Sequence, residues 1–435
     1  MKVALVALPN PVLANPEAHF PQSLLYVAAG LLRTGHQVQI VDLRARRYIT
    51  EADIPDVDCV GITCTSGERD WAKLVGRLAR QKDAITMVGG AHPTFMPEDC
   101  EDFDIIVRGD GELAAVEALS EIALAGPGEA WLGTAGCGGA RRGKAGRGGE
   151  GKEGQGVKTY SHPLPSLNGY SPAWELIGLK GFSKELFGGQ GYGQGPLAAG
   201  IISSRGCGMR CAYCRSERDK IRLRPITEVV AEIELLKSEY GVTHFRFYDE
   251  NFSNPKPRAL ELFKALQPLG VHIRAHTRSD AWDDELAEAY KRAGGIEMGF
   301  GFEAATDSVL EKIRKQETVE QHREAVRVCK RHGILVKAFW MVGLSGQRWA
   351  EIEDIKRFMA EERPDRWIVS VFAAYPGSDV WEHSIRYNVT YLDLDLSHYW
   401  NFPERPTIGY QDNAREDIWA QYQDLVAWLE RAFPR

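Results

Sequence analysis

Residues 203–214 read Ser-Ser-Arg-Gly-Cys-Gly-Met-Arg-Cys-Ala-Tyr-Cys and bring Cys207, Cys211 and Cys214 within eight residues of one another. Glycines on both sides of the first cysteine allow a tight loop in which three thiolates can converge on one metal centre. A structural zinc site takes four protein ligands, and no further His or Cys lies near this stretch. A cubane iron–sulfur cluster also normally takes four thiolates. Three cysteines therefore predict a cluster with one iron left open to another ligand.

The sequence around this loop alternates between strand-like and helical patterns. Short apolar runs predict six strands at Ala199–Ser203, Thr243–Tyr248, Val271–Thr277, Glu297–Phe302, Leu335–Val342 and Trp367–Ala373. Helical segments fall between them, and Thr227 is available as the N-cap of a helix with the apolar positions Val229, Ile233, Leu236 and Tyr240. Right-handed helical crossovers can close such strands partway into a barrel. We expect a partial barrel over 199–377 and a C-terminal region, 378–435, that ends in a helix over Ala414–Phe433.

Residues 1–125 show the same alternation with shorter strands. Strands are predicted at Val3–Leu8, Gln37–Val41, Cys59–Thr63, Ile85–Val88 and Asp104–Val107. Helical spacing lies between them, over Leu24–Thr34, Asp70–Gln81 and Leu113–Ala125. This order is typical of a doubly wound, Rossmann-like α/β domain with a parallel sheet. The ligands of such sheets bind at the carboxyl ends of the strands.

The two series are separated by sequence that can bury little. Residues 126–156 are dense in glycine and charge, and they predict a flexible linker or an exposed loop. Residues 157–198 carry several prolines and aromatic residues, which predict an irregular connecting segment packed partly against the next domain.

Composition limits the class of protein. A chain of 435 residues, 44% hydrophobic and 26% charged, is sufficient for two or three globular domains. The net charge of −7 offers no field that attracts nucleic acid or an anionic membrane. The opening apolar run is too short to span a membrane, and no cleavage site follows it. We therefore expect a cytoplasmic protein that binds neither nucleic acid nor a membrane. Single cysteines are interpreted as buried or bystander residues: Cys59, Cys64, Cys100, Cys137 and Cys329.

The spacing Cys-x3-Cys-x2-Cys, with Tyr213 before the last cysteine, resembles the signature of the radical S-adenosylmethionine (SAM) superfamily. The resemblance implies a [4Fe–4S] cluster held by Cys207, Cys211 and Cys214, whose open iron chelates the amino and carboxylate groups of SAM. Cleavage of SAM would give methionine and a 5′-deoxyadenosyl radical, and it requires an external electron donor. An incomplete zinc loop is the alternative, and the agreement of the flanking sequence argues against it.

Two further segments supply polar residues to the implied SAM site. Residues 248–252, Tyr-Asp-Glu-Asn-Phe, resemble the acidic motif of the family, which implies that Asp249 or Glu250 accepts a hydrogen bond from the SAM ammonium. Arg274, His276 and Arg278 share one candidate inward face of the next strand. Arg278 lies nearest its carboxyl end and is expected to meet SAM, with a structural pair to an acid as an equal alternative.

Residues 299–303, Gly-Phe-Gly-Phe-Glu, resemble the Gly-x-Glu segment of the family. Strand alternation places Gly299, Gly301 and Glu303 on one face, where the glycines leave room for a ligand. Glu303 is expected to bind the SAM ribose, with a structural ion pair as the alternative. Later landmarks imply that Met341 and Tyr375 flank the adenine, although core packing accounts equally well for Met341.

The N-terminal strand ends resemble the cobalamin-binding domain that is fused to many radical SAM enzymes. The cofactor-binding residues implied are Thr65, Ser66, Gly89, Gly90, His92, Gly109, Gly111 and Glu112. The glycines would let backbone N–H groups approach the corrin amides and the phosphate. The Asp-x-His-x-x-Gly motif that supplies a lower cobalt ligand in related domains is absent. His92, followed by Pro93 in a tight turn, is expected to be a hydrogen-bonding loop residue.

Together the resemblances identify the chain as a member of the cobalamin-dependent (class B) radical SAM methyltransferases. They imply methylation of an unactivated sp³ carbon by means of a 5′-deoxyadenosyl radical and methylcobalamin. One alternative is a cyclisation or rearrangement without methyl transfer, and another is a cobalamin-binding sensor, against which the intact cysteines argue. The two-domain layout is similar to archaeal C-methyltransferases that act on a glutamine of methyl-coenzyme M reductase. We therefore expect a peptide or protein substrate, with a small molecule as the rival.

Overall fold

The computed structural model describes residues 1–10, 21–125, 157–162, 164–178, 195–216, 220–399 and 405–434. The chain divides into two compact units, Met1–Pro9 with Ser23–Leu164 and Asn10–Gln22 with Pro165–Arg435. The linker predicted at 126–156 lies outside the described residues. Within the described ranges, no helix combines the length and apolar character that crossing a membrane requires. The cytoplasmic location stays a prediction.

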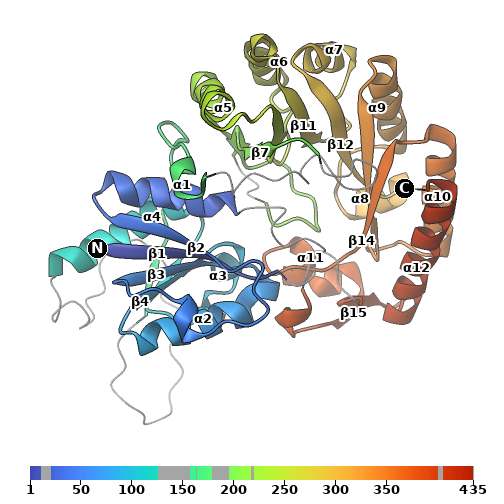
Figure 1. The fold of residues 1–435 in the computed structure, drawn as a ribbon. Coiled ribbons are helices and arrows are strands. Elements are labelled where there is room, and N and C mark those ends of the chain that lie inside the picture. The colour runs from blue at the N-terminus through green and yellow to red at the C-terminus, as the bar shows by residue number, and fades with distance from the viewer. Residues whose placement is uncertain are drawn as a thin grey trace. The chain divides into compact units, whose positions relative to one another are not determined.

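The first unit contains a parallel sheet with helices on both faces (Figure 1). Its six strands are β1 (Lys2–Ala7), β2 (Gln37–Asp42), β3 (Cys59–Thr63), β4 (Ile85–Gly89), β5 (Ile105–Val107) and β6 (Lys158–Tyr160). The spatial order is β2–β1–β3–β4–β5–β6, and all neighbours are parallel. The predicted doubly wound fold is confirmed. Its order reverses between β1 and β3, which is where such sheets bind ligands.

The helices of this unit are α1 (Gln22–Arg33), α2 (Arg69–Gln81), α3 (Ala91–Phe95) and α4 (Gly111–Ala125). Helices α1 and α4 cover one face of the sheet, and α2 and α3 cover the other (Figure 1). Gly30 of α1 permits a close approach to α4, because a Cβ there would lie 2.8 Å from the carbonyl oxygen of Glu112. On the opposite face, Val75 and Ala79 of α2 enter one apolar core with Val60 of β3.

Strand β6 was not predicted, because Lys158-Thr159-Tyr160 contains no apolar run. It pairs with β5 in parallel, with Lys158 opposite Ile105. Its Tyr160 is buried at 8% exposure and donates a hydrogen bond of 2.6 Å to Glu121 of α4. The strand therefore depends on the open edge of β5 and on contacts with α4, neither of which is visible in the local sequence.

The second unit contains another parallel sheet, with the order β14–β13–β12–β11–β10–β7. Its strands are β7 (Ala198–Ile201), β10 (His244–Phe247), β11 (His272–Thr277), β12 (Gly295–Glu303), β13 (Leu335–Val342) and β14 (Arg366–Val371). Strands β7 and β14 form the two edges, which agrees with the predicted partial barrel. A short antiparallel pair, β8 (Ser204–Arg205) and β9 (Arg222–Leu223), lies beside the cysteine loop.

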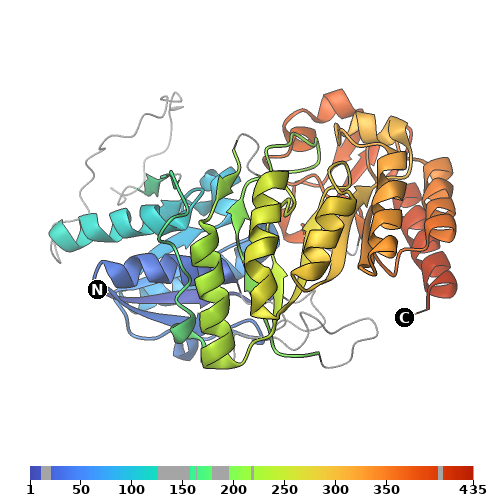
Figure 2. The same ribbon diagram turned by 90° about the horizontal axis from the view of Figure 1, so that it is seen from above.

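Helices cover the outer face of this sheet, and their sequential packing is seen in Figure 2. They are α5 (Ile226–Tyr240), α6 (Lys256–Leu266), α7 (Asp284–Arg292), α9 (Val319–Arg331), α10 (Trp349–Glu362) and α12 (Arg415–Ala432). Two short helices, α8 (Asp307–Lys312) and α11 (Asp379–Glu382), follow β12 and β14. The C-terminal region adds an antiparallel pair, β15 (Val389–Leu392) and β16 (Ile408–Tyr410), before α12.

Helix α5 begins earlier than the sequence suggested. Pro225 occupies the N-cap position without a side-chain hydrogen bond, and Thr227 lies inside the first turn. The prediction of Thr227 as N-cap is therefore wrong. Proline suits this start because its φ, here −53°, is already close to helical and it has no N–H group to satisfy.

A buried ion pair holds α5 to the segment that precedes it. Arg224 and Glu232 are 1% and 4% exposed, and their charged groups are in direct contact. Glu232 also accepts a 2.8 Å hydrogen bond from the indole N–H of Trp174. The connecting segment around Trp174 is thus tied to the second unit through a polar contact as well as by apolar packing.

Glu232→Ala should strongly destabilise the second unit, because it leaves the Arg224 guanidinium buried without its closest carboxylate. We expect a loss of about 3–5 kcal/mol in the free energy of unfolding, measured by denaturant titration followed by circular dichroism. Glu234→Ala removes an exposed carboxylate from the same helix and should change stability by less than about 0.5 kcal/mol. Equal losses in the two variants would contradict the assignment.

Candidate active site

The cysteine loop follows β7 and is anchored at its start by Asp249. This carboxylate is 4% exposed and accepts hydrogen bonds from the backbone N–H of Ser203 at 2.7 Å and the hydroxyl of Ser204 at 2.8 Å. The neighbouring Glu250 accepts a 3.1 Å hydrogen bond from the backbone N–H of Gly206 and lines the cavity described next. Of the two acidic candidates, Asp249 fixes the loop and Glu250 faces the ligand space.

A cavity of about 1080 Å³, part of it open to solvent, lies on the inner side of the second sheet. Its walls bring together most of the residues predicted for the SAM site, namely Cys207, Cys211, Tyr213, Cys214, Glu250, Arg278, Glu303 and Met341. Asp249 and Tyr375 are not part of this wall. The Tyr375 ring instead lies against the Arg215 guanidinium, 4.5 Å from its central carbon.

The three thiols border this cavity without meeting at one point. In the described part of the chain, no three His, Cys, Asp or Glu side chains are grouped closely enough for a single metal ion. A multi-iron cluster holds its thiolates further apart than a single ion does, and its open iron needs free space beside it. The loop and its cavity therefore fit a cluster better than a closed zinc site.

The remaining described cysteines are structural in character. Cys59, Cys64, Cys100 and Cys329 are all buried. Burial raises the pKa of Cys100 and of Cys329 to about 12, so both thiols stay protonated and unreactive at neutral pH. Cys137 lies outside the described residues.

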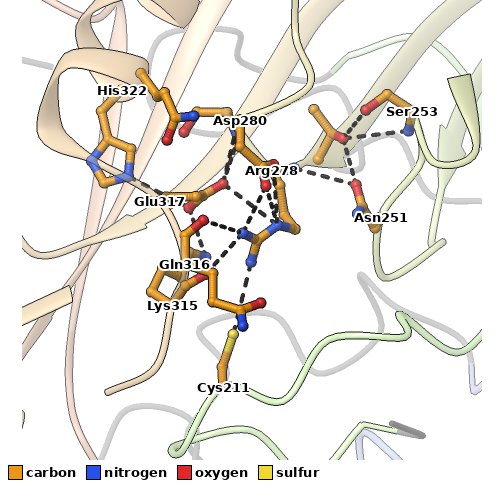
Figure 3. A network of polar contacts seen from close by, with 12 residues as sticks. Cys211, Asn251, Ser253, Arg278, Asp280, Lys315, Gln316, Glu317 and His322 are labelled. Atoms are coloured by element: carbon orange, nitrogen blue, oxygen red, sulfur yellow. Dashed lines mark hydrogen bonds and ion pairs between the residues drawn. The ribbon is translucent and has the colours of Figure 1, made fainter. Parts of the chain in front are cut away.

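Arg278 is the centre of a polar network at the cavity wall (Figure 3). Its Nη2 donates to Asp280 Oδ2 at 2.9 Å and to the carbonyl oxygen of Lys315 at 2.8 Å. Glu317 Oε1 lies 3.6 Å from Arg278 Nε, and Nη1 lies 3.8 Å from the sulfur of Cys211. The structural pair considered for Arg278 is present, and contact with SAM stays a prediction that its position beside Cys211 would allow.

A second set of charges adjoins this network around Lys315. Lys315 Nζ lies 3.6 Å from Glu303 Oε1 and 3.4 Å from Glu317 Oε2, and it donates a 3.2 Å hydrogen bond to the hydroxyl of Tyr213. The Tyr213 hydroxyl in turn donates to Glu303 at 3.3 Å. Burial raises the pKa of the Glu303 carboxyl, and Lys315 counteracts this. The structural ion pair considered for Glu303 is present, although Glu303 also lines the cavity.

Sequence reasoning did not find Lys315 or Glu317. Both lie on the chain between α8 and α9, where no periodic pattern separates them from exposed charged residues. Glu317 is nevertheless buried, and the neighbouring charges hold its pKa at about 2 against the effect of burial. Only the fold brings Lys315 to the cavity wall and Glu317 to within 3.4 Å of it.

The room expected over the two glycines of β12 is occupied by the protein itself. A Cβ on Gly299 would lie 2.5 Å from the His276 ring, and one on Gly301 would lie 2.5 Å from Glu303 Oε1. Gly301 borders the cavity and Gly299 does not. Glu303 adopts a left-handed backbone conformation with φ 67°, at a shift in strand register. The expected ligand space at Gly299 is therefore wrong, because His276 of β11 fills it.

A separate cavity of about 500 Å³ lies within the first unit, beside the carboxyl ends of β3, β4 and β5. Four of the residues predicted to bind cobalamin border it, namely Gly89, Gly90, Gly109 and Gly111. The other four, Thr65, Ser66, His92 and Glu112, do not. Apolar side chains such as Leu5, Val27 and Val107 form much of its wall.

The predicted residues outside this cavity are engaged in local structure. Thr65 caps the helical turn after β3, and its backbone N–H and hydroxyl each donate to Glu68 at 2.9 Å. His92 is 1% exposed, with its ring nitrogens 3.1 Å from Asp99 Oδ2 and 3.4 Å from Ser66 Oγ. Burial lowers the pKa of His92, although Asp99 opposes this. His92 is a hydrogen-bonded residue, but it lies in the short helix α3 and not in a tight turn.

Two of the cavity glycines are required for different reasons. Gly90 has φ 104°, and a Cβ there would lie 2.9 Å from the carbonyl oxygen of Cys64, so close packing excludes a side chain. Gly109 has φ 76°, and nothing lies within 4 Å of the place a Cβ would take. Exposed backbone beside open space is what a ligand that bonds to main-chain groups needs. The glycine loops at this cavity therefore suit a ligand that bonds to main-chain groups, as part of a cobalamin would.

Two parts of the chain match known families. Residues 201–359 match the radical SAM superfamily, and residues 13–119 match the B12 binding domain. The chain is thus a radical SAM enzyme with a cobalamin-binding domain. Its cofactors are a [4Fe–4S] cluster, SAM and cobalamin, and its reaction needs an external electron donor.

Three relatives match over most of the chain. An uncharacterized methyltransferase of Pyrococcus horikoshii is 28% identical, covering 85% of this chain and 79% of the relative. Cytidylyl-2-hydroxyethylphosphonate methyltransferase of Streptomyces wedmorensis is 26% identical with the same coverage. An anaerobic magnesium-protoporphyrin IX monomethyl ester cyclase of Rubrivivax gelatinosus is 26% identical, covering 85% of this chain and 67% of the relative.

A solved structure shows the same architecture. The radical SAM methyltransferase TsrM of Kitasatospora setae superposes with a TM-score of 0.64 at 19% identity, covering 87% of this chain and 76% of that protein. At this level of identity the likeness concerns the fold. With the two matched domains and the named methyltransferases, the chain belongs to the cobalamin-dependent radical SAM methyltransferase family.

Gly109→Ala should reduce the cobalamin content of the purified protein, because the new methyl group projects into open cavity space. The left-handed φ adds a stability cost of about 1 kcal/mol. Gly35→Ala is a matched control, since Gly35 has φ 85° and equally open surroundings but lies before β2, away from the cavity. Cobalamin per protein, measured by absorbance after gel filtration, should fall only in the first variant. A parallel loss in both variants would indicate strain alone.

Proposed function

We propose that this chain is a C-methyltransferase that replaces a hydrogen atom on an unactivated sp³ carbon with a methyl group. The observation that carries the proposal is the presence of both cofactor-binding domains, each with a cavity built from its own residues. When bound, the cluster and SAM supply a 5′-deoxyadenosyl radical for hydrogen abstraction, and methylcobalamin supplies the methyl group.

The chain's own residues then have distinct roles. Cys207, Cys211 and Cys214 would hold the cluster. Glu250 borders the same cavity and can accept a hydrogen bond from the SAM ammonium, while Gly206 keeps its carboxylate oriented. Arg278 would bring a positive charge beside the cluster, since its Nη1 points to the sulfur of Cys211.

The other wall of the cavity supports binding of the nucleoside part of SAM. Glu303 would accept hydrogen bonds from the ribose, and Lys315, 3.6 Å away, partly offsets the rise in its pKa that burial causes. Met341 would pack against the adenine. Because these charges are already paired within the protein, little reorganisation would be needed when SAM displaces water.

The substrate expected from the sequence was a peptide or a protein, and that expectation has gained no support. The named relatives of known substrate act on small molecules, a cytidylyl phosphonate and a porphyrin. We therefore favour a small organic substrate. Candidate peptides and small molecules can be compared by mass spectrometry for the gain of one methyl group.

A second function has one observation in its favour. The cyclase of Rubrivivax gelatinosus matches 85% of this chain, so a ring closure without methyl transfer is compatible with this architecture. The residues that would hold the cluster and SAM would serve that reaction equally. The two functions differ only in the fate of the SAM methyl group.

SAM carrying a deuterated methyl group separates the two functions. C-methylation predicts a product heavier than the substrate by one fully deuterated methyl group, seen by mass spectrometry. A new product that has no added methyl group would reject C-methylation and favour the cyclisation or rearrangement.

Cys211→Ala should abolish cluster binding, because only two of the three proposed thiolates remain. We expect loss of the iron-dependent absorbance after anaerobic reconstitution and loss of SAM cleavage to 5′-deoxyadenosine. Cys329→Ala also removes a buried thiol, but one that is not part of the cavity wall, and should keep both properties. Retention of a full cluster in Cys211→Ala would disprove the ligand assignment.

A further inference from the structure

Four cationic side chains occupy the inner face of the second sheet, towards the amino ends of its strands. They are Arg246 of β10, Arg274 of β11, Lys337 of β13 and Arg366 of β14, and we call them the cation layer. Side chains two residues apart on a strand share a face. Arg274, Lys337 and Arg366 each precede a cavity-lining residue by two positions, namely His276, Phe339 and Ile368. Arg246 joins this face as the register partner of Arg274.

The strand register places like charges beside each other. Arg246 is directly opposite Arg274, and Lys337 is directly opposite Arg366. Cations on neighbouring strands repel one another, and the repulsion is stronger where water is partly excluded. Such an arrangement lowers the stability of the sheet unless negative charge is brought to it.

The described residues provide too little negative charge for this layer. Glu297 of β12 bonds to Arg274 Nε at 2.8 Å and lies 3.0 Å from Arg366 Nη1. No carboxylate of the described chain lies within 4.0 Å of the charged groups of Arg246 or Lys337. These two cations lie instead over aromatic rings, Arg246 over Tyr248 at 4.9 Å and Lys337 over Phe339 at 5.4 Å.

The surroundings of Lys337 also contain too little negative charge. Burial lowers its pKa to about 8, and Arg274 and Arg246 act in the same direction against Glu297. His276 follows Arg274 by two residues on β11 and lines the SAM cavity, and burial together with nearby cations keeps this ring neutral by lowering its pKa. The layer is therefore poised to gain from a bound anion.

We propose that the cation layer binds an oxyanion of the substrate, a carboxylate or a phosphate, with Arg246 and Lys337 as the principal contacts. Glu297 orients Arg274 and Arg366 as the second pair. The anion would anchor one end of the substrate on the inner face beside His276, so that the rest extends along this face towards the cysteine loop. The role as a substrate anchor rests on the proposed function, whereas binding of an anion does not.

This proposal names a substrate class. A small molecule bearing a carboxylate or a phosphate fits the layer, whereas a neutral hydrocarbon would leave the cations without compensation. Retention of such destabilising groups is common where binding requires them. The SAM carboxylate is the competing source of negative charge, and it is distinguished by measuring SAM affinity separately.

The test uses the full chain, purified and reconstituted anaerobically, with pyrophosphate and succinate as probes at constant ionic strength. Each probe's dissociation constant is obtained from its saturable effect on the thermal unfolding midpoint. At least one probe should stabilise the wild-type protein. Lys337→Met and Arg246→Met should each weaken that binding by about tenfold or more, since a charge-assisted contact is lost. The better probe distinguishes phosphate from carboxylate.

Two controls keep the result decisive. Lys264→Met removes an exposed cation from α6 and should leave probe binding unchanged. Without probe, Lys337→Met should unfold at the same temperature as wild type or higher, because repulsion is relieved. SAM affinity and cleavage should be unaffected in Lys337→Met.

Three results would overturn the proposal. These are no saturable stabilisation of the wild type, equal binding in Lys337→Met, or loss of SAM affinity in that variant. None of them depends on methyl transfer, so failure of the anion site and failure of the proposed function are separate outcomes.

Discussion

The buried carboxylate of Asp249 is the contact on which the candidate active site depends. It ties the backbone and side chains of Ser203 and Ser204, at the start of the cysteine loop, to the end of β10. Burying a charge without hydrogen-bond partners costs free energy. The hydrogen bonds that the Asp249 carboxylate accepts therefore hold the start of the loop in place. The position of Cys207 and the orientation of Glu250 both follow from this anchor, because Gly206 connects the two.

The second unit contains two groups of cations, one with several carboxylate partners and one with few. Around the cysteine loop, Arg278 and Lys315 have carboxylate partners in Asp280 and Glu317 (Figure 3), and Lys315 also lies beside Glu303. Deeper on the same face, the cation layer has Glu297 as its nearest carboxylate among the described residues. A matched network suits a cofactor that is always the same, whereas an unmatched layer suits a ligand that brings its own charge.

The two units use one principle to make space for ligands. In each, a parallel sheet places loops together at the carboxyl ends of its strands. Glycine then determines whether space is filled or left open, as at Gly299, which His276 covers, and Gly109, which faces open space. Glycine thus has opposite consequences within a strand, at Gly299, and in the loop after a strand, at Gly109, and these depend on the side chains that lie nearby.

The sequence alone determined the alternation of strands and helices, the doubly wound and partial-barrel folds, and the stretch that carries the cysteines. These features are local, since apolar period and motif spacing are written in consecutive residues. It could not predict β6, which needs the edge of β5, or the start of α5 at Pro225. Nor could it choose between Asp249 and Glu250, because adjacent residues differ only in where their side chains point.

Only the tertiary structure decided which side chains lie at the cavities. It brought Lys315 to the cavity wall with Glu317 beside it, placed Tyr375 and His92 outside the cavity walls, and set the cation layer across four strands. These residues lie tens to more than a hundred positions apart in sequence, and their charges interact only because register and burial place them together. Register and burial are properties of the whole sheet, so no segment read by itself contains them.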